Sequence, residues 1–463
     1  MRTRTTTAAL MAAALLAACA QGTSDDEGGG DGGSAASFDS EATLEGSLQV
    51  MGFTPDVDEI AEVRWDRAQE ALGSGVKVEA IEGDLDIQQF LSSVASGEPP
   101  EVVYADRSQI GTFASRGAII PLTDCIEGEG IDTSVYLEAA LGQVTFADEI
   151  YGIPEFNVVQ LIQANGDLLK EAGLTLDDVN GSSWEAVAAA NQKLAQSDGG
   201  KLSVIGFDSK LPEFLPLWAK ANGADILSSD GRTAQLDDPA VIEALEFAVS
   251  IYDDQGGFSD VKAFRDSADF FGEGNQFATG TLGAMPMEQW YVNVLNEVSP
   301  DAPLAFDTVR TTEGDPLAFS SGSAWGIPRG GDYPEAACRF ARTMTETDSW
   351  IAAAEERVRL RSEEGGSFTG LLTANGAADE AVREMVKPSG DAKWDQGVEK
   401  TYEANEHTFA LPANPAGEEF TTAWQDGVNR VLNGQQEPGE AMAQAQEEAQ
   451  AALDEAWAEW DDK

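Results

Sequence analysis

A short apolar stretch that ends in polar and aromatic residues is the first place in the sequence where side chains could bind a small molecule. In NQFATGTLGAMPMEQW, Asn275 to Trp290, the run LGAMPM leads directly into Glu288, Gln289 and Trp290. A carboxylate and an amide accept and donate hydrogen bonds, and an indole adds a flat apolar face with one N–H donor. This combination suits a solvated pocket better than a core, so we predict that the three side chains line a binding site.

The composition of the chain narrows the chemistry that its side chains can perform. The sequence holds 82 Asp and Glu against 28 Lys and Arg, a formal net charge of −54 at pH 7. Such a charge argues against electrostatic binding of nucleic acid or of an anionic membrane surface. His407 is the only histidine, which nearly excludes histidine-based metal sites and Ser–His or Cys–His catalysis. We therefore expect no metal, no cofactor and no nucleic-acid partner.

The first residues have the features of an export signal. Two arginines precede an apolar run, Ala8–Ala18, that is too short to span a bilayer. The run ends in LAAC, Leu16 to Cys19, which resembles the lipobox of bacterial lipoproteins. That resemblance implies cleavage before Cys19 and lipid attachment to its sulfur. The alternative is an ordinary signal peptide cut at an Ala-x-Ala site, with Cys19 lost or left free.

Behind the signal peptide, residues 1–18, lies a segment with almost nothing to bury. Residues 19–46 would carry the lipidated cysteine and a tether rich in Gly, Ser and Asp, which we expect to be disordered. No later stretch has the roughly 20 continuous apolar residues of a spanning helix. The lipid would then be the only membrane anchor, and we expect an extracytoplasmic protein on the outer face of the cell membrane.

Strands and helices alternate in the folded body. Segments with strand patterns are 47–53, 76–82 and 100–105, and segments with helical patterns between them are 58–72 and 86–97. This βαβ order predicts a doubly wound, mostly parallel sheet. Ligands bind beyond the carboxyl ends of such strands, and Phe53 and Asp106 stand at two of these ends. The chain is too long for one core, so we expect two lobes.

Seven motifs resemble those of a known family and occur in its order. They are FLSSVASGEPPEVVYADRSQIGTFASRGAIIPLTD, IYGIPEFNVVQLIQANGDLLKEAGL, SWEAVAAANQKL, DDPAVIEALEFAVSIY, FATGTLGAMPMEQW, SGSAWGIPRGGDYPEAACRFARTM and VNRVLNGQQEPGEAMAQAQEEAQAALD. The family is that of the extracytoplasmic solute-binding proteins of bacterial ABC importers, specifically the sugar binders that include the maltose type. Each motif is weak alone, but the ordered set is specific. The sequence departs from the motifs of the family at Glu101, at Gln289 and over residues 163–165, and these departures bear on which sugar is bound.

The resemblance implies an α/β, two-lobe periplasmic-binding-protein-like fold of type II. Each lobe would be a doubly wound, mostly parallel sheet, and hinge crossings would join the lobes. The implied boundaries are residues 47–156 plus 326–371 for lobe 1 and 157–325 plus 372–463 for lobe 2. This assignment places Cys125 and Cys338 in one lobe outside the cytoplasm, where disulfides persist, so we expect them to be bonded.

The resemblance also implies a function without covalent chemistry. The lobes of a monomer would close on a sugar, and the closed form would dock on an ABC permease. A sugar has apolar C–H faces and a rim of hydroxyls, so its site needs flat aromatics beside carboxylates and amides. The candidates are Phe53, Asp106, Glu155, Phe156, Glu213, Phe214, Glu288, Gln289, Trp290, Ser323 and Trp325.

Each candidate also has a purely structural interpretation. Trp290 and Phe53 can be core residues, Asp106 can cap a turn or helix, and Glu155 and Phe156 can pack the hinge. Two other functions stay open. A glycosidase would use two carboxylates, although 82 acids make accidental pairs certain. A binder of a non-sugar solute, such as an oligopeptide, a polyamine or another cation, would use aromatics beside carboxylates.

Overall fold

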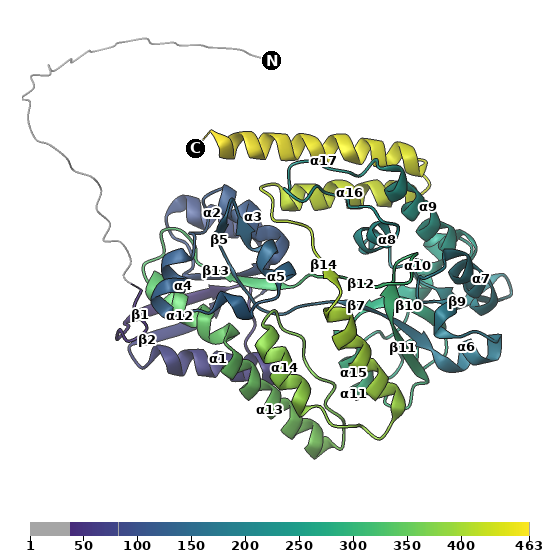
Figure 1. Ribbon diagram of the computed structural model, residues 1–463, viewed down its shortest axis with the longest axis horizontal. Coiled ribbons are helices and arrows are strands. Elements are labelled where there is room, and N and C mark those ends of the chain that lie inside the picture. Colours follow the sequence, from purple (N-terminus) through teal and green to yellow (C-terminus); the bar gives the residue numbers. More distant parts are fainter. Residues whose placement is uncertain (1–37, 82, 463) are drawn as a thin grey trace, which may run out of the picture. The chain divides into compact units, whose positions relative to one another are not determined.

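Two separate β-sheets organise the part of the chain that the structure describes, residues 38–81 and 83–462. The structure is a computed structural model, and Figure 1 shows one sheet with its helices on the left and the other on the right. We call these parts lobe 1 and lobe 2. The predicted signal peptide, Cys19 and most of the predicted tether lie outside the described residues. None of the described helices combines the length and apolar character needed to cross a bilayer.

Lobe 1 is built on a five-stranded sheet with the order β2-β1-β3-β13-β6. The strands are β1 (Gly46–Met51), β2 (Val76–Ile81), β3 (Val102–Asp106), β6 (Ile153–Pro154) and β13 (Ser323–Gly326). β1 pairs in parallel with β2 and β3, whereas β13 is antiparallel to β3 and β6. The carboxyl ends of the parallel strands therefore meet at one edge, and Asp106 lies there.

Helices lie on both sides of the lobe 1 sheet in Figure 1. Asp58 caps the first of them, because its Oδ1 accepts from the Ala61 N–H at 2.8 Å. The helices are α1 (Glu59–Leu72), α2 (Ile87–Ser96), α3 (Arg107–Ser115), α4 (Thr123–Glu129), η1 (Thr133–Val135), α5 (Glu138–Gln143), α12 (Pro334–Thr345), α13 (Thr347–Glu364) and α14 (Gly376–Met385). A two-stranded hairpin, β4 (Thr145–Phe146) and β5 (Glu149–Ile150), completes the lobe.

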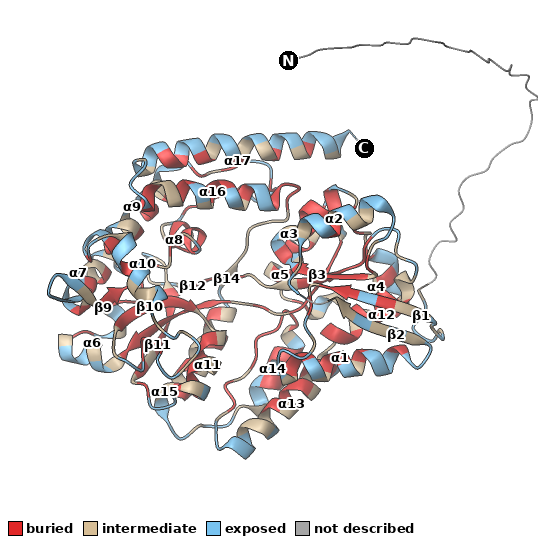
Figure 2. Cartoon of the chain, turned by 180° about the vertical axis from the view of Figure 1, so that it is seen from behind, coloured by how far each residue is buried: buried red, intermediate tan, exposed pale blue. Residues whose placement is uncertain are grey.

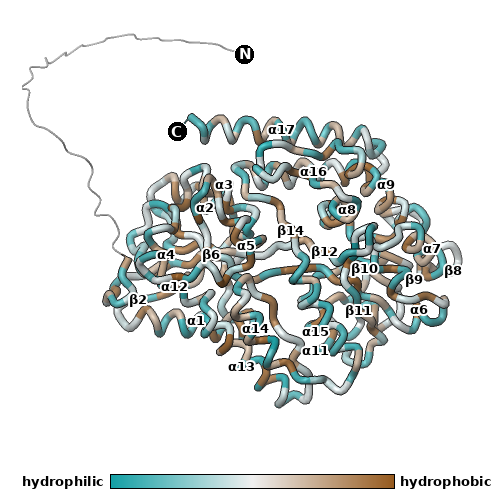
Figure 3. The backbone as a smooth tube through the Cα atoms, in the orientation of Figure 1, coloured by the Kyte–Doolittle hydropathy of each residue, from teal (hydrophilic) through white to brown (hydrophobic). Residues whose placement is uncertain are grey.

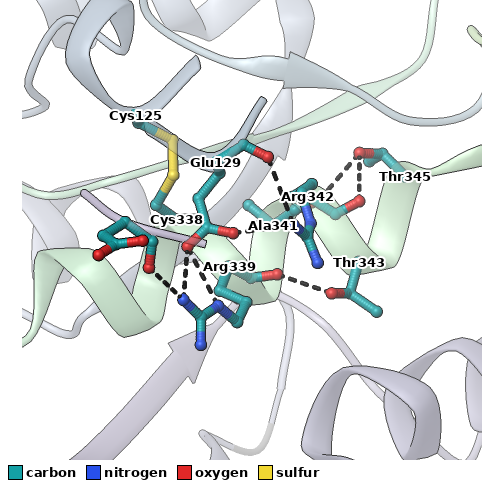
Figure 4. Close-up of a disulfide and its surroundings, with 9 residues drawn as sticks. Cys125, Glu129, Cys338, Arg339, Ala341, Arg342, Thr343 and Thr345 are labelled. Atoms are coloured by element: carbon teal, nitrogen blue, oxygen red, sulfur yellow. Dashed lines mark hydrogen bonds and ion pairs between the residues drawn. A yellow bond between two sulfur atoms is a disulfide. The ribbon is translucent and has the colours of Figure 1, made fainter. Parts of the chain in front are cut away.

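A disulfide joins Cys125 of α4 to Cys338 of α12, with the two Cα atoms 5.8 Å apart. Figure 4 shows the bond beside the buried carboxylate of Glu129, which Arg339 and Arg342 reach at 2.9 and 3.0 Å. Arg339 also donates to Ala42 O at 2.8 Å. The disulfide thus joins α4 to α12, and Arg339 fastens the start of the described chain to the same part of lobe 1.

Lobe 2 contains a seven-stranded sheet with the order β14-β12-β11-β7-β10-β9-β8. Its strands are β7 (Gln160–Asn165), β8 (Gln196–Asp198), β9 (Lys201–Phe207), β10 (Leu282–Glu288), β11 (Leu304–Arg310), β12 (Pro316–Phe319) and β14 (Thr408–Phe409). Only β9–β10 and β12–β14 are parallel pairs. This sheet is more mixed than predicted, since residue periodicity carries no information on strand direction.

The helices of lobe 2 bury their apolar faces on this sheet and expose polar ones. They are α6 (Gly166–Ala172), η2 (Leu176–Asp178), α7 (Trp184–Leu194), α8 (Leu215–Ala221), α9 (Pro239–Asp253), α10 (Phe258–Asp266), α11 (Trp290–Val298) and α15 (Ala392–Asn405). Figure 2 shows the strands of both sheets largely buried, and Figure 3 shows hydrophilic residues concentrated on the outer helices. This is the pattern expected of a protein with a strongly charged surface.

Two C-terminal helices, α16 (Gly417–Leu432) and α17 (Pro438–Asp461), touch both lobes. They run side by side along the upper edge of Figure 1, and α16 contacts α3 of lobe 1 as well as α9 of lobe 2. On α17, Trp457 stacks on Phe146 of lobe 1 with ring centroids 5.3 Å apart. The pair therefore bridges the lobes rather than belonging to lobe 2 alone.

Three segments cross between the lobes. Residues 155–159 join β6 to β7, residues 320–322 join β12 to β13, and residues 386–391 join α14 to α15. The third crossing follows α14, whose Ala378 and Val382 pack into an apolar cluster of lobe 1. The predicted boundary at residue 371 therefore lies too early, because the apolar face of α14 is buried against α13.

Replacing Cys125 by Ser should lower the free energy of unfolding by about 3–5 kcal/mol. The disulfide links residues 213 positions apart and so restricts a large part of the unfolded chain. Chemical denaturation of the purified protein would measure the change. Cys338→Ser and the double variant should match it, and a reductant should bring the parent protein to the same value. Equal denaturation midpoints for parent and variants would contradict the prediction.

Candidate functional site

A buried arginine holds two of the crossings against lobe 1. Arg107, the first residue of α3, is fully buried. Its side chain donates to Gln143 Oε1 (2.9 Å), Phe156 O (2.6 Å), Asn157 Oδ1 (3.0 Å), Ser320 Oγ (3.2 Å) and Ser321 O. All of these acceptors are neutral, and burial lowers the pKa of the guanidinium to about 9. The base of the inter-lobe region is thus organised by one cation and the oxygens of the first and second crossings.

The close approach of these crossings requires a glycine. Gly322 has φ +139°, and a Cβ there would collide with Phe156 O. The Gly322 carbonyl also accepts from the Arg107 backbone N–H at 2.9 Å. The second crossing therefore lies directly against the first.

The polar network continues from the first crossing to α14 and α15. Asn157 Nδ2 donates to Asn405 Oδ1 at 2.6 Å, and Asn405 Nδ2 donates to Asp379 Oδ2 at 3.1 Å. Asp379 Oδ1 accepts from the Thr373 N–H at 2.7 Å. Burial raises the pKa of Asp379 to about 7, although these hydrogen bonds oppose the shift. The buried Asp379 of lobe 1 and the half-buried Asn405 of lobe 2 therefore link the lobes.

A cavity of about 660 Å³ lies between the lobes in front of Arg107. It brings together six residues that the sequence predicts as ligand contacts: Asp106, Glu213, Phe214, Glu288, Trp290 and Ser323. A larger cavity of about 740 Å³ adjoins Asp379 and is lined by none of the predicted residues. We assign the candidate site to the cavity of about 660 Å³, called the first cavity below, because of the residues that line it and not because of its size.

The opening motif forms a rigid platform in this cavity. Trp290 Nε1 donates to Glu288 Oε2 at 2.6 Å. The Trp290 ring lies nearly parallel to that of Phe271, with centroids 6.1 Å apart, and Phe270 meets it edge-on. Burial raises the pKa of Glu288, opposed by the Trp290 hydrogen bond. Glu288 Oε1 accepts no hydrogen bond from the described residues, so it can serve a ligand.

Across the cavity, the end of β3 presents a second carboxylate. Asp106 is exposed to the cleft, and its own backbone N–H donates to Gln109 Oε1 at 3.2 Å. Desolvation raises the pKa of Asp106, and the positive charge of the neighbouring Arg107 lowers it. Asp106 and Glu288 thus offer charged acceptors from opposite lobes.

The loop after β9 adds the one lysine among the cavity-lining residues that the structure describes. Lys210 has φ +56° and its Nζ lies 3.6 Å from Glu213. Its backbone N–H donates to the buried Asp208 at 2.9 Å, and Asp208 is paired with Arg265 at 3.1 Å. Asp208 therefore shapes the loop that carries Lys210 and Glu213.

Five predicted residues do not line this cavity, and three of them are held in lobe 1. Phe53 and Trp325 are buried in the lobe 1 core, with ring centroids 5.0 Å apart. The register of β13 pairs Trp325 with Tyr104, and the two rings pack together. Glu155 is buried in an ion pair with Arg64. These positions correct the prediction, because core packing and a charge partner in lobe 1 hold the side chains away from the cleft.

Two further predicted residues, Phe156 and Gln289, line a second cavity of about 410 Å³. Gln289 holds the first crossing, since its Oε1 accepts from the Val159 N–H at 2.9 Å and its Nε2 donates to Asn157 O at 3.2 Å. Its amide is therefore engaged within the protein. The second cavity also borders on Trp290 and Ser323.

Several residues of the first cavity were not predicted. They are Ser108, Gln143, Val158, Gln160, Lys210, Phe270, Met287, Phe319, Ser321, Gly322, Thr421, Gln425 and others from the segment 411–425, including Phe420 and Trp424. Trp424 suits helix packing equally well in the sequence. Among these residues, Lys210 could have been found from the sequence, because it lies three residues before the predicted Glu213 in the same loop.

Comparison with known proteins identifies the family. Residues 66–359 match the family described as bacterial extracellular solute-binding protein. The arabinooligosaccharide-binding protein of Bacillus subtilis is 21% identical over 254 residues, 54% of this chain, and the match spans only 57% of that relative's length. Among solved structures, CpMnBP1 with mannobiose bound superposes with a TM-score of 0.69 at 22% identity, covering 87% of this chain and 99% of that one.

A further solved structure agrees in fold. The GacH receptor of Streptomyces glaucescens, known unliganded and with acarbose, has a TM-score of 0.68 at 17% identity, with 89% of this chain and 99% of that chain covered. At such identities the likeness concerns the fold alone, and it confirms the predicted two-lobe periplasmic-binding-protein-like architecture. The family and these neighbours are binding proteins rather than enzymes.

Replacing Asp379 by Asn should change how stability depends on pH. Because the folded-state pKa is raised, the folded protein keeps a proton that the unfolded chain releases between about pH 4 and pH 7. The retained proton stabilises the folded state fully below about pH 4, and this stabilisation is lost as the pH rises through about 7. Asn cannot ionise, so the parent should lose roughly 2–4 kcal/mol more than the variant over this window.

Urea denaturation of both proteins from pH 4 to pH 8 measures this difference. The slope against pH is the test, since the amide alters the hydrogen bonds at every pH. Asp395→Asn on the exposed start of α15 serves as the control. Parallel pH profiles for the parent and Asp379→Asn would contradict the assignment.

Proposed function

Because the chain belongs to the family of bacterial extracellular solute-binding proteins, we propose that it captures a carbohydrate between its lobes and delivers it to an ABC import permease. The family is extracytoplasmic. Capture requires no bond making or breaking, so the chain acts as a carrier without catalysis. A monomer suffices, because both walls of the site come from one chain.

One observation carries this proposal: two carboxylates on opposite lobes face a cavity whose floor holds an oriented indole. Asp106 and Glu288 supply charged acceptors, which make stronger hydrogen bonds to hydroxyls than neutral ones do. Trp290 supplies a flat apolar face for the C–H side of a sugar ring. The Gln143 side chain adds an amide N–H donor, while its Oε1 accepts from Arg107.

The same walls support one other class of ligand. Asp106, Glu213 and Glu288 face the cavity with only Lys210 to balance them among the described lining residues. Aromatic faces beside carboxylates bind organic cations, so a polyamine or another cationic solute is the second candidate. Salt distinguishes the two, since screening weakens the binding of a cation more than that of a neutral sugar.

Delivery to a permease also requires that the protein stay at the membrane. The lipobox-like LAAC places lipid on Cys19, and the segment up to residue 38 serves as the tether. About 20 such residues have a root-mean-square reach of roughly 25 Å. Arg339 donates to Asp39 O and Ala42 O, so the first residues that the structure describes are held in lobe 1.

A thermal-shift screen of the purified chain against mono-, di- and oligosaccharides should produce a hit. A ligand at about 100 times its Kd stabilises the folded state by roughly 2.7 kcal/mol. Spermidine and a tripeptide panel provide the comparison, with and without 0.5 M NaCl. Stabilisation by a cation alone, weakened by salt, would favour the second candidate. No shift with any sugar would contradict the carbohydrate proposal.

Trp290→Ala should weaken binding of the sugar found in this screen by about tenfold or more, roughly 1.4 kcal/mol. The change removes the platform that Glu288 and Phe271 hold in place. Isothermal titration calorimetry measures the effect. Trp184→Ala is the matched control, because Trp184 stacks on Phe247 in the outer layer of lobe 2. Equal losses in both variants would mean that the effect is structural.

A further inference from the structure

The first crossing between the lobes is an extended segment with two different faces. Phe156 pairs with Thr373 and Val158 pairs with Ser321, both as antiparallel bridges. Successive side chains of an extended segment point to opposite faces. Phe156 and Val158 line the cavities of the cleft, so the side chain of Asn157 between them points to the opposite face.

A separate cavity of about 740 Å³, which we call the rear cavity, lies on the side to which Asn157 points. Asn157 Nδ2 donates to Asn405 Oδ1 at 2.6 Å, and Asn405 and Asp379 both line the rear cavity. Its walls come from α5 and α14 of lobe 1 and from α15 and β14 of lobe 2. Figure 1 shows α14 and α15 next to each other between the two sheets. None of the residues that line the rear cavity lines a cavity of the cleft.

The crossings therefore act as a pivot between the cleft and the rear cavity. A rotation of the lobes about an axis through the crossings narrows the cleft and widens the rear side, because the two lie on opposite faces of one segment. One hydrogen bond spans the rear side, from Asn405 Nδ2 of α15 to Asp379 Oδ2 of α14 at 3.1 Å. Closure of the cleft separates these two groups and admits water to Asp379.

This separation changes the surroundings of an ionisable group. While the link is intact, Asp379 is 5% exposed, and burial raises its pKa to about 7. In water the pKa of an aspartate is about 3.9. The linked state therefore binds a proton more tightly than the separated state, so protonation favours the link and ionisation favours separation. A protonated carboxyl still accepts hydrogen bonds, so the bond from Asn405 survives protonation.

The other titratable side chains at the rear cavity come from α5, α14 and α15. They are Glu138, Glu380, Arg383, Tyr402 and Glu406. The four charged ones are exposed, and Arg383 lies 3.7 Å from Glu406. Burial raises the pKa of Tyr402, which stays neutral. Solvent and salt screen exposed charges, so Asp379 is the group whose surroundings change most when the helices separate.

We propose that Asp379 is a positioning residue that controls closure of the cleft from the opposite face of the hinge, and that loss of its proton favours the closed form. Asp379 lines neither cavity of the cleft, so it acts without touching the ligand. The protein then binds its solute more tightly above pH 7 than below pH 6. This consequence for affinity rests on the proposed function, whereas the movement of the lobes does not.

The test measures the separation of the lobes without any ligand. Nitroxide spin labels are attached through Gln88→Cys at the start of α2 in lobe 1 and Ala263→Cys of α10 in lobe 2, both exposed positions. Both helices lie beside the cleft. Leu85 packs near the end of β1 just before α2, and Phe270, just after α10, lines the first cavity. Closure of the cleft should therefore shorten the distance between the labels.

Double electron–electron resonance at pH 5.5 and pH 8 gives the populations of short and long distances. A Cys19→Ser background leaves only the disulfide-bonded cysteines, which do not react with the label. In the parent, the ratio of short to long distances should rise at least threefold from pH 5.5 to pH 8. The two pKa values, about 7 and about 3.9, set an upper limit of about 30-fold.

Two variants assign this change to the rear link. Asp379→Asn should remove the dependence on pH, because an amide does not ionise. Asn405→Ala removes the partner in lobe 2 and should raise the short-distance population at pH 5.5. The second variant keeps the test valid if the first fails to fold. His407→Gln is the matched control, since the only histidine of the sequence is exposed two residues after Asn405.

The control should keep the pH dependence of the parent. Equal populations at both pH values in the parent would overturn the inference, and so would a dependence that survives in Asp379→Asn or disappears in His407→Gln. A failure of every sugar to bind would refute the proposed function and would leave these population measurements unaffected.

Discussion

The site depends on one buried charge. Arg107 has been removed from water and forms no ion pair with a carboxylate of the described residues, an arrangement that is costly unless every N–H finds an acceptor. Apart from Gln143 of α5, its acceptors are carbonyls and neutral side chains of the two crossings that form the base of the cleft. The desolvation cost is thus offset by hydrogen bonds that exist only when both crossings are in place. Arg107 begins α3 and directly follows Asp106, so the position of the base of the cleft is fixed relative to the wall that carries Asp106.

Opposite this wall, the binding surface is stiffened by short-range contacts. Trp290 begins α11 directly after β10 ends, and its ring is bound through its N–H and through Phe271. Gln289 lies between Glu288, the last residue of β10, and Trp290, and its side chain makes two hydrogen bonds to the backbone of the first crossing. One short motif therefore brings a carboxylate and an aromatic ring to the cavity and makes a contact to the first crossing. Two cavities meet at that face because the motif projects between the lobes.

The contacts that join the lobes differ in character around the cleft. At the hinge, the buried Asp379 and the half-buried Asn405 link α14 to α15. Farther out, Thr112 Oγ1 of α3 accepts from the Gly417 N–H of α16 at 3.0 Å, and Arg116 and Glu419 form an exposed ion pair. A Cβ at Gly111 or Gly417 would collide with backbone of the other segment, so glycine permits this close approach. The exposed Arg116–Glu419 pair contributes little energy, so the close packing and the Thr112 hydrogen bond account for most of this outer contact.

The sequence by itself determined the α/β class, the order of elements and the residues at the ends of β3 and β10. The positions of Asp106, Glu288 and Trp290 at the cavity could be predicted because a buried apolar run followed by polar residues marks a strand end, and clefts form at strand ends in such sheets. The sequence could not decide which side of a strand faces the cleft. Trp325 points into the lobe 1 core because side chains alternate along a strand and the pairing of β13 with β3 selects the face. Phe53, which lies beyond the end of β1, packs against Trp325 in the same core. Lys210, Phe420 and Thr369 reach the cleft from distant segments, and only tertiary packing brings them there.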